Sequence, residues 1–197
     1  MEFKESISCF VLHLPKTLKD TIMCGDIELF LDPKFNPVKH RIPKGKVLAA
    51  PTKTTTPITK GDYVYFHHNI IHNQKTVMGG DYYAVFDRPS DPTVYAYENE
   101  TTPFTPVYDY MFIEPMQAEE KEVAGLKITG QHKEKDIREG IIKYASVQSH
   151  EMFKTKYGID DVIGKRVNFR RYRNYVVDVN GDDLFRMKAK DINFFYA

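Results

Sequence analysis

The sequence has little cysteine, no tryptophan, no excess of charge and no long apolar run. Among its 197 residues, 28 Lys and Arg stand against 27 Asp and Glu, which gives a formal net charge of +1. Proteins that bind nucleic acid nonspecifically carry a strong basic excess, so this balance argues against that class. No apolar run approaches the ~18 residues of a membrane-spanning helix. The hydrophobic fraction of 42% nevertheless suffices for a packed core.

The two cysteines, Cys9 and Cys24, are too few for a secreted domain stabilised by disulfides. The N-terminus has no basic region followed by an apolar stretch, as a signal peptide would have. These features favour a reducing, intracellular compartment. We therefore expect the protein in the cytoplasm.

Residue patterns that carry catalysis are also absent. The sequence has no Ser-His-Asp or Cys-His arrangement and no phosphate-binding glycine loop. The adjacent carboxylates at 119–120 and 160–161 have no partners to tune them, which favours solvated loop charges over catalysts. We expect a protein that is not an enzyme and that uses no cofactor of its own.

What the sequence does contain is typical of β structure. Tyr and Phe number 13 each, and strand-like alternation is visible in Tyr63–Phe66 and in Tyr175–Val179. Only Ser149–Tyr157 has a helical pattern, sufficient for one or two turns and without a clear cap. The composition predicts an all-β fold of short strands joined by turns.

Four segments in the first half recur in the same order in the second half. They are Phe10–Pro15 with Tyr110–Pro115, Lys44–Ala50 with Glu139–Ala145, Lys60–Phe66 with Ile163–Phe169, and Val77–Tyr83 with Val179–Leu184. Pro115 lies 100 residues after Pro15, and Gly164 lies 103 residues after Gly61. The nearly constant spacing predicts two copies of one β unit, residues 1–98 and 107–197. The alternative is chance similarity between strand-rich segments.

The second copy resembles the GroES-type co-chaperonin, the small subunit that caps a GroEL-type chaperonin ring. The resemblance lies in an opening strand, a charged loop with a short apolar motif, a return strand, a closing hairpin and a last strand: Asp109–Pro115, Ala118–Ile128, Lys133–Ile142, Gly164–Arg186 and Lys190–Ile192. It implies two tandem GroES-like β-barrels, a homo-oligomer, and ATP bound by the partner ring.

The loop at 117–135 alternates charged and small residues, so it buries too little apolar surface to fold alone. Within it, Leu126 and Ile128 flank Lys127, and residues two apart in an extended chain share a face. We expect this pair to dock into an apolar groove of the chaperonin, with Gly125 letting the backbone adapt. The alternative is an ordinary hairpin with both side chains packed against their own domain.

The first copy fits the family less closely. Its loop is expected at Lys16–Asp26, and Ile27 and Leu29 then correspond to Leu126 and Ile128. An alternative alignment uses Ile27–Pro33 as the opening strand and leaves this copy without a mobile loop. Its connection from Gly45 to Gly61 is too short for most of the roof hairpin that the family can carry there. The tandem form resembles plastid co-chaperonins, but without a transit peptide a bacterial or phage-encoded protein is equally expected.

Two other clusters of residues were weighed as sites. His67, His68 and His72, near Asp62, suggest a metal, but alternate residues of a strand point to opposite faces, which favours surface histidines. A basic patch with aromatic residues between its charges suggests that the protein binds single-stranded nucleic acid. The nearly neutral net charge of the chain argues against this function. This patch comprises Lys165, Arg166, Phe169, Arg170, Arg171, Tyr172, Arg173 and Tyr175.

The function predicted from the sequence is thus a co-chaperonin that closes the chamber of an ATP-driven chaperonin. Two alternatives stay open: a structural or assembly protein that reuses the barrel, and a single-strand nucleic-acid binding module.

Overall fold

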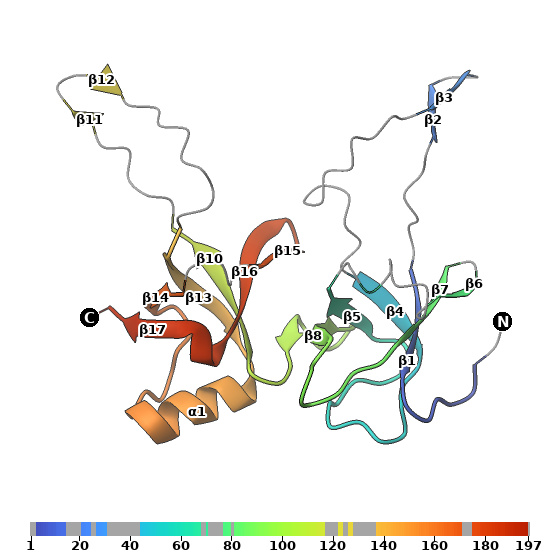
Figure 1. The fold of residues 1–197 in the computed structure, drawn as a ribbon, viewed down its shortest axis with the longest axis horizontal. Helices are drawn as coiled ribbons and strands as arrows, with labels where there is room; N and C mark the ends of the chain where they lie inside the picture. The colour runs from blue at the N-terminus through green and yellow to red at the C-terminus, as the bar shows by residue number, and fades with distance from the viewer. Residues whose placement is uncertain are drawn as a thin grey trace. The chain divides into compact units, whose positions relative to one another are not determined.

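The computed structural model describes residues 3–14, 21–24, 27–30, 44–67, 70, 77–79, 81–116, 122–123, 126–127, 137–170 and 175–196. The chain forms two compact units, Met1–Phe104 and Thr105–Ala197, and the described elements are mostly β strands (Figure 1). The mostly β composition expected from the sequence is confirmed. The boundary between the units lies within residues 99–106.

The first unit is built on one antiparallel sheet with the strand order β6-β7-β1-β4-β5-β8. A separate two-stranded hairpin, β2–β3, lies in sequence between β1 and β4. The strands are β1 (Phe10–His13), β2 (Thr21–Cys24), β3 (Ile27–Phe30), β4 (Lys44–Ala49), β5 (Tyr63–Phe66), β6 (Val77–Gly79), β7 (Tyr82–Val85) and β8 (Val94–Glu98).

The second unit repeats this plan in the order β15-β16-β10-β13-β14-β17, with the hairpin β11–β12 in sequence between β10 and β13. Its elements are β9 (Thr105–Pro106), β10 (Tyr110–Pro115), β11 (Glu122–Val123), β12 (Leu126–Lys127), β13 (Glu139–Ala145), α1 (Val147–Tyr157), β14 (Arg166–Phe169), β15 (Tyr175–Val179), β16 (Asp182–Lys188), the 3-10 helix η3 (Ala189–Asp191) and β17 (Ile192–Phe195).

The two sheets agree in register as well as in strand order. Equivalent cross-strand pairs are Leu12–Val47 with Ile113–Ile142, Gly45–Val64 with Gly140–Val167, and Phe66–Val94 with Phe169–Ile192. Register irregularities also occur at equivalent places, between β1 and β4 as between β10 and β13, and between β5 and β8 as between β14 and β17. This register aligns Leu12 with Ile113, one residue away from the alignment through the two prolines.

Glycine turns precede the equivalent strands β5 and β14. Gly61 and Gly164 have φ of 103° and 76°, a conformation that other residues rarely adopt. The amide of Gly61 donates to the carbonyl of Val47 at 2.9 Å, and that of Gly164 donates to the carbonyl of Ile142 at 2.8 Å. The turn at Asn180–Gly181, between β15 and β16, also has positive φ at both residues.

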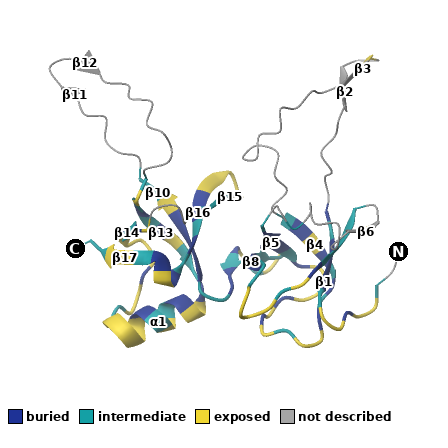
Figure 2. Cartoon of the chain, viewed as in Figure 1, coloured by how far each residue is buried: buried dark blue, intermediate teal, exposed yellow. Residues whose placement is uncertain are grey.

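Alternating strand residues supply the core of each unit, and Figure 2 shows the buried positions concentrated on the strands. In the first unit the fully buried side chains include Phe10, Leu12, Val47, Val64 and Phe66. In the second unit a core cluster is formed by Met111, Ile113, Ile142, Phe153, Val162, Val167, Phe169, Phe185, Met187 and Ala189. The core of each unit therefore includes side chains of the central strands, β1 and β4 or β10 and β13, between which the loops are inserted.

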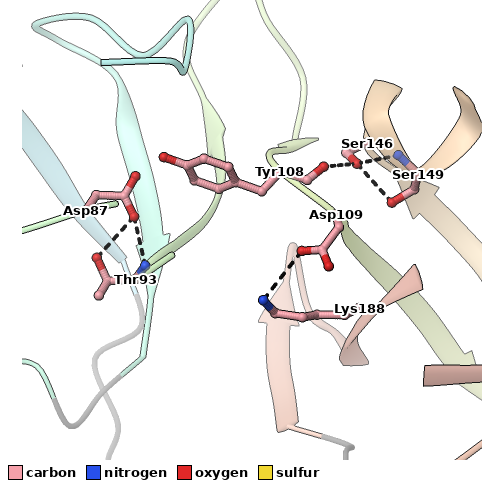
Figure 3. Close-up of polar contacts among 7 residues, drawn as sticks. All are labelled: Asp87, Thr93, Tyr108, Asp109, Ser146, Ser149 and Lys188. Atoms are coloured by element: carbon pink, nitrogen blue, oxygen red, sulfur yellow. Dashed lines mark hydrogen bonds and ion pairs between the residues drawn. The ribbon is translucent and has the colours of Figure 1, made fainter. Parts of the chain in front are cut away.

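Helix α1 is longer than the sequence predicted, and it has the N-cap that the sequence analysis missed. Ser146 Oγ accepts a hydrogen bond from the amide of Ser149 at 3.1 Å and donates to the carbonyl of Tyr108 (Figure 3). Phe153 is buried and packs edge-on against Phe195, with ring centroids 5.1 Å apart. Serine is a favoured N-cap residue, so the cap at Ser146 could have been predicted from the sequence. The hydrogen bond to Tyr108 joins residues far apart in the chain and depends on the tertiary structure.

This helix occupies the connection between Gly140 and Gly164, where the family resemblance implies room for a roof hairpin. In the first unit the equivalent connection, residues 50–62, is fully described and contains turns, bends and an isolated bridge between Ser6 and Pro51. The expectation that the first copy lacks most of a roof hairpin is thus in line with its structure.

Closure of either sheet into a barrel stays a prediction. Within the described residues, no pairing joins β6 to β8 in the first unit, or β15 to β17 in the second. What the structure establishes is an antiparallel sheet in each unit, with the same strand order.

We predict that Gly140→Ala destabilises the second unit by about 1–3 kcal/mol, the range of overpacked cores. A Cβ atom at Gly140 would lie 2.5 Å from Ile113 Cγ2 and also against the backbone of Glu114. The matched variant is Gly45→Ala, whose Cβ would lie 2.8 Å from the end of the flexible Leu14 side chain. Chemical denaturation should show the larger loss for Gly140→Ala, and equal losses would contradict the prediction.

Candidate partner-binding site

Each unit carries its hairpin in the same connection of the sheet. The loop of the second unit leaves β10 and returns in β13, and within it Val123 pairs with Leu126 and Glu122 with Lys127. The loop of the first unit leaves β1 and returns in β4, and β2 and β3 pair within it. Because β1–β4 and β10–β13 are neighbouring strands, the two ends of each loop are held side by side.

The residues predicted to bind a partner lie partly within this description. Leu126 and Lys127 form β12, whereas Gly125 and Ile128 lie outside the described residues. In the first loop, Ile27 and Leu29 both belong to β3. Strand β1 pairs with β4 and β7, just as β10 pairs with the equivalent strands β13 and β16. This favours the alignment in which the two copies are equal in length over the alternative in which the first copy begins at Ile27.

Ile27 is the predicted contact whose side-chain exposure is described, and it is 65% exposed. It pairs with Cys24 across a two-residue connection, as Leu126 pairs with Val123. The register thus places Ile27 and Leu126 at equivalent positions of their hairpins, which agrees with the correspondence expected from the sequence.

Where the second loop returns to its sheet, three side chains form a polar cluster. Arg166 Nη2 donates to Glu139 Oε2 at 2.6 Å, and the hydroxyl of Tyr196 donates to Glu139 Oε1. The guanidinium carbon of Arg166 also lies 4.4 Å from the centre of the Tyr196 ring. Glu139 is the first residue of β13, so the cluster ties the base of the loop to the last strand of the unit.

The contacts shift the pKa values of these groups. The hydrogen bond from Tyr196 is the main cause that lowers the pKa of the Glu139 carboxyl, and the hydrogen bond from Arg166 lowers it further. The same bond to Glu139 raises the pKa of the Tyr196 hydroxyl. Nearby, the hydrogen bond to Glu114 raises the pKa of Lys143, with the amine and carboxylate 2.9 Å apart.

The first unit has a polar cluster at the equivalent place, made of different residues. Lys44, the first residue of β4, forms an ion pair with Glu98, and the hydroxyl of Tyr65 donates to Glu98 at 3.1 Å. Lys44 Nζ also lies 5.0 Å from the centre of the Tyr63 ring. The sequence analysis missed both clusters because their members are far apart in the chain.

The metal site considered from the sequence is described only in part. His67 is described and half-buried, whereas His68 and His72 lie outside the described residues. In the described part of the chain, no group of three or more His, Cys, Asp or Glu side chains is arranged to hold a metal ion.

The described part of the basic patch is engaged at some positions and exposed at others. Phe169 is 1% exposed within the core and is therefore no surface ring for stacking bases. Arg166 is bound to Glu139, and Tyr175 contacts Arg186. Lys165 and Arg170 are exposed, and residues 171–174 lie outside the described residues.

Of the two pairs of adjacent carboxylates, the pair at 160–161 is described, and both of its members bind other residues of the unit. Asp160 forms an exposed ion pair with Lys154 at 3.0 Å, and Asp161 accepts a hydrogen bond from the amide of Ile163. Glu119 and Glu120 lie outside the described residues. Among the described residues, no helix has the length and apolar character needed to cross a membrane.

Comparison with known proteins identifies the second unit. The family model of the chaperonin 10 kDa subunit matches residues 103–195. Co-chaperonin GroES 1 of Rhizobium meliloti (strain 1021) is 32% identical over 92 residues, which are 47% of this chain and 93% of that protein. Co-chaperonin GroES of Zymomonas mobilis is 34% identical over 89 residues, which are 45% of this chain and 93% of that protein.

The chain belongs to the chaperonin 10 kDa subunit family. Co-chaperonin GroES of Rickettsia bellii is likewise 27% identical over 89 residues. The GroES family is one of non-enzymatic co-chaperonins, which confirms the prediction that the protein is not an enzyme. Each of these matches spans just under half of the chain, and the family model covers all the strands of the second sheet.

We predict that Tyr196→Phe raises the pKa of Glu139 towards its ordinary value, because the hydrogen bond from the Tyr196 hydroxyl is the largest single cause that lowers it. Arg166→Gln should also raise it, because the hydrogen bond and the charge of Arg166 both lower the pKa of Glu139. A lowered pKa means that the cluster stabilises the folded unit above the unfolded carboxyl pKa, and that this contribution is lost as pH falls through the folded value. Carboxyl ¹³C titration by NMR measures the shift.

The control for this prediction is Tyr157→Phe, since Tyr157 is an exposed residue of the same unit. It should leave the pKa of Glu139 unchanged. A pKa of Glu139 that does not change in Tyr196→Phe would contradict the prediction.

Proposed function

We propose that the protein is a co-chaperonin that caps the ring of a GroEL-type chaperonin and assists ATP-dependent protein folding in the cytoplasm. The observation that carries the proposal is the family match over 103–195, together with an inserted hairpin loop between the central strands β10 and β13. In this proposal the partner ring binds the ATP, and this chain attaches to the ring and closes its chamber.

We further propose that the first unit is a second GroES-type domain, which gives the chain two tandem domains. Its support is structural, because the family match lies in the second unit. The two sheets share strand order, cross-strand register, two register irregularities and a positive-φ glycine before the fifth strand. Agreement at this level is more than strand-rich sequences share by chance.

The contacts with the chaperonin are proposed to be Leu126 and Ile128, with Gly125 and Lys127 in the backbone between and beside them. Ile27 and Leu29 are the corresponding pair of the first loop. The charged and small residues of 117–135 favour a segment that orders on contact, which keeps each single attachment weak. Several weak loops on one assembly then bind tightly together and release as a set.

A homo-oligomer supplies the several loops. In the second unit, β15 and β17 end the strand order and each has a described pairing partner on one side. Open strand edges are available for pairing with another chain, and association is one way in which proteins cover them. We propose that the edges of this sheet are used in that way.

The function is tested with Leu126→Ser combined with Ile128→Ser in the full chain. Burying one aliphatic side chain contributes about 1.5–3 kcal/mol, so losing both should weaken binding to a GroEL-type chaperonin with ATP by roughly 100-fold or more. Ile163→Ser, at a position in the same unit that is 42% exposed, is the matched control and should bind normally.

Limited proteolysis is a second test of the same loop. Cleavage between residues 119 and 135 is expected in the free chain, with protection when chaperonin and nucleotide are added. Cleavage that is unchanged by the chaperonin, or normal binding by the double variant, would count against the proposed function.

A further inference from the structure

The connection between β15 and β16 (Figure 1) consists of Asn180 and Gly181, the only asparagine–glycine dipeptide in the sequence. Val179 pairs with Asp182 on either side of it, so the turn contains two residues. Asn180 and Gly181 have φ of 57° and 96°, the positive values of the type I′ turn that this dipeptide favours. Both residues are exposed to solvent. An asparagine side chain therefore lies at the surface next to the backbone nitrogen of a glycine.

This dipeptide undergoes a reaction that needs no enzyme. The backbone nitrogen of Gly181 bonds to Cγ of Asn180 and gives up its proton, while the bond from Cγ to Nδ2 breaks and ammonia leaves. The product is a five-membered succinimide ring. Water then opens the ring at one of its two carbonyl carbons, which yields either aspartate or isoaspartate, in which the main chain runs through Cγ. Glycine favours the first step because it has no side chain to crowd the attacking nitrogen.

The fold holds the attacking nitrogen in a hydrogen bond. The Gly181 amide donates to Asp178 Oδ1 at 3.1 Å, a bond between exposed residues. A carboxylate is too weak a base to remove a backbone amide proton, so this bond fixes the N–H in place and does not activate the nitrogen. Exposed hydrogen bonds at the tip of a hairpin open more easily than those of a core. The reaction therefore proceeds from an open form of the turn, and the bond to Asp178 limits the population of that form.

The residues around the turn confine this opening to the tip of the hairpin. Asp178 and Asp183 lie directly opposite each other on the two strands, and like charges in that arrangement are destabilising. Val177 and Leu184, the next pair away from the turn, are buried, with exposed fractions of 0% and 2%. Apolar burial thus keeps the strands paired below the tip, while charge repulsion loosens the tip itself.

We infer that Asn180 is a site of spontaneous covalent modification in the folded protein, where it converts to aspartate and isoaspartate, and that the hydrogen bond from Gly181 to Asp178 restrains the conversion. The inference does not depend on the proposed function. Either product adds a carboxylate to a turn already flanked by Asp178, Asp182 and Asp183. Isoaspartate also lengthens the main chain of a two-residue turn, and turn length sets the register of a hairpin. Conversion therefore weakens the pairing of β15, which lies at one end of the strand order of its sheet.

The inference is tested by incubating the full chain at mildly alkaline pH and following its peptides by mass spectrometry. The peptide with Asn180 should gain the mass difference between oxygen and an NH group, and fragmentation should identify both aspartate and isoaspartate. The matched comparison is Asn193, another exposed asparagine of the same unit, which is followed by Phe194. Its conversion should be roughly tenfold slower or more, because a bulky side chain crowds the attacking nitrogen where glycine leaves it free. Equal rates at the two residues, or no conversion of Asn180, overturn the inference.

Two variants of Asp178 test the role of the hydrogen bond. Asp178→Ala removes the acceptor and should speed the conversion of Asn180 about two- to tenfold, the change in population that the loss of one typical hydrogen bond produces. Asp178→Asn removes the same negative charge but keeps an oxygen acceptor, so it should speed the conversion less. An unchanged or lower rate in Asp178→Ala, or an equal rise in both variants, overturns the role assigned to the hydrogen bond.

Denaturation separates the effect of the fold from that of the local sequence. In concentrated urea the bond between Gly181 and Asp178 is absent, so the wild type and both variants should convert at one common rate. That rate should exceed the rate of the folded wild type. A wild-type chain that converts equally fast when folded and unfolded would show that the fold does not restrain the site, and would overturn that part of the inference.

Discussion

The close pairing of β10 with β13, and of β1 with β4, is the constraint on which the rest of each unit depends. Pro115 pairs with Gly140 at the point where the second loop leaves and re-enters the sheet, and a side chain at Gly140 would collide with the backbone of Glu114. At the equivalent Gly45 a side chain would instead meet the end of the Leu14 side chain, at 2.8 Å. These two glycines let a long insertion begin and end on adjacent central strands without disturbing the core beside it.

The side chains around that junction differ between the two units, although the register of the strands is the same. Lys44 and Glu139 occupy the same register position, yet one is a cation paired with Glu98 and the other an anion bound by Tyr196 and Arg166. Both clusters link the base of a loop to the last strand of its unit. Equivalent geometry built from opposite charges indicates that the position needs a polar link, which more than one set of residues can supply.

The family match and the structure support the proposed function in different ways. The match over 103–195 identifies the second unit as a chaperonin 10 kDa subunit domain, and the shared register brings the first unit into the same plan. Helix α1 in the second unit, and a short connection in the first, mean that the two copies differ where the family can carry a roof hairpin.

The sequence alone determined the features that depend on local residue preference. The strands Tyr63–Phe66 and Tyr175–Val179 follow from the β preference of their residues, which acts over a few positions. Only the tertiary structure decided the hydrogen bond from Ser146 to Tyr108, the one-residue shift that aligns Leu12 with Ile113, and the burial of Phe169. Each depends on contacts between residues far apart in the chain, and a local pattern has no means of encoding those.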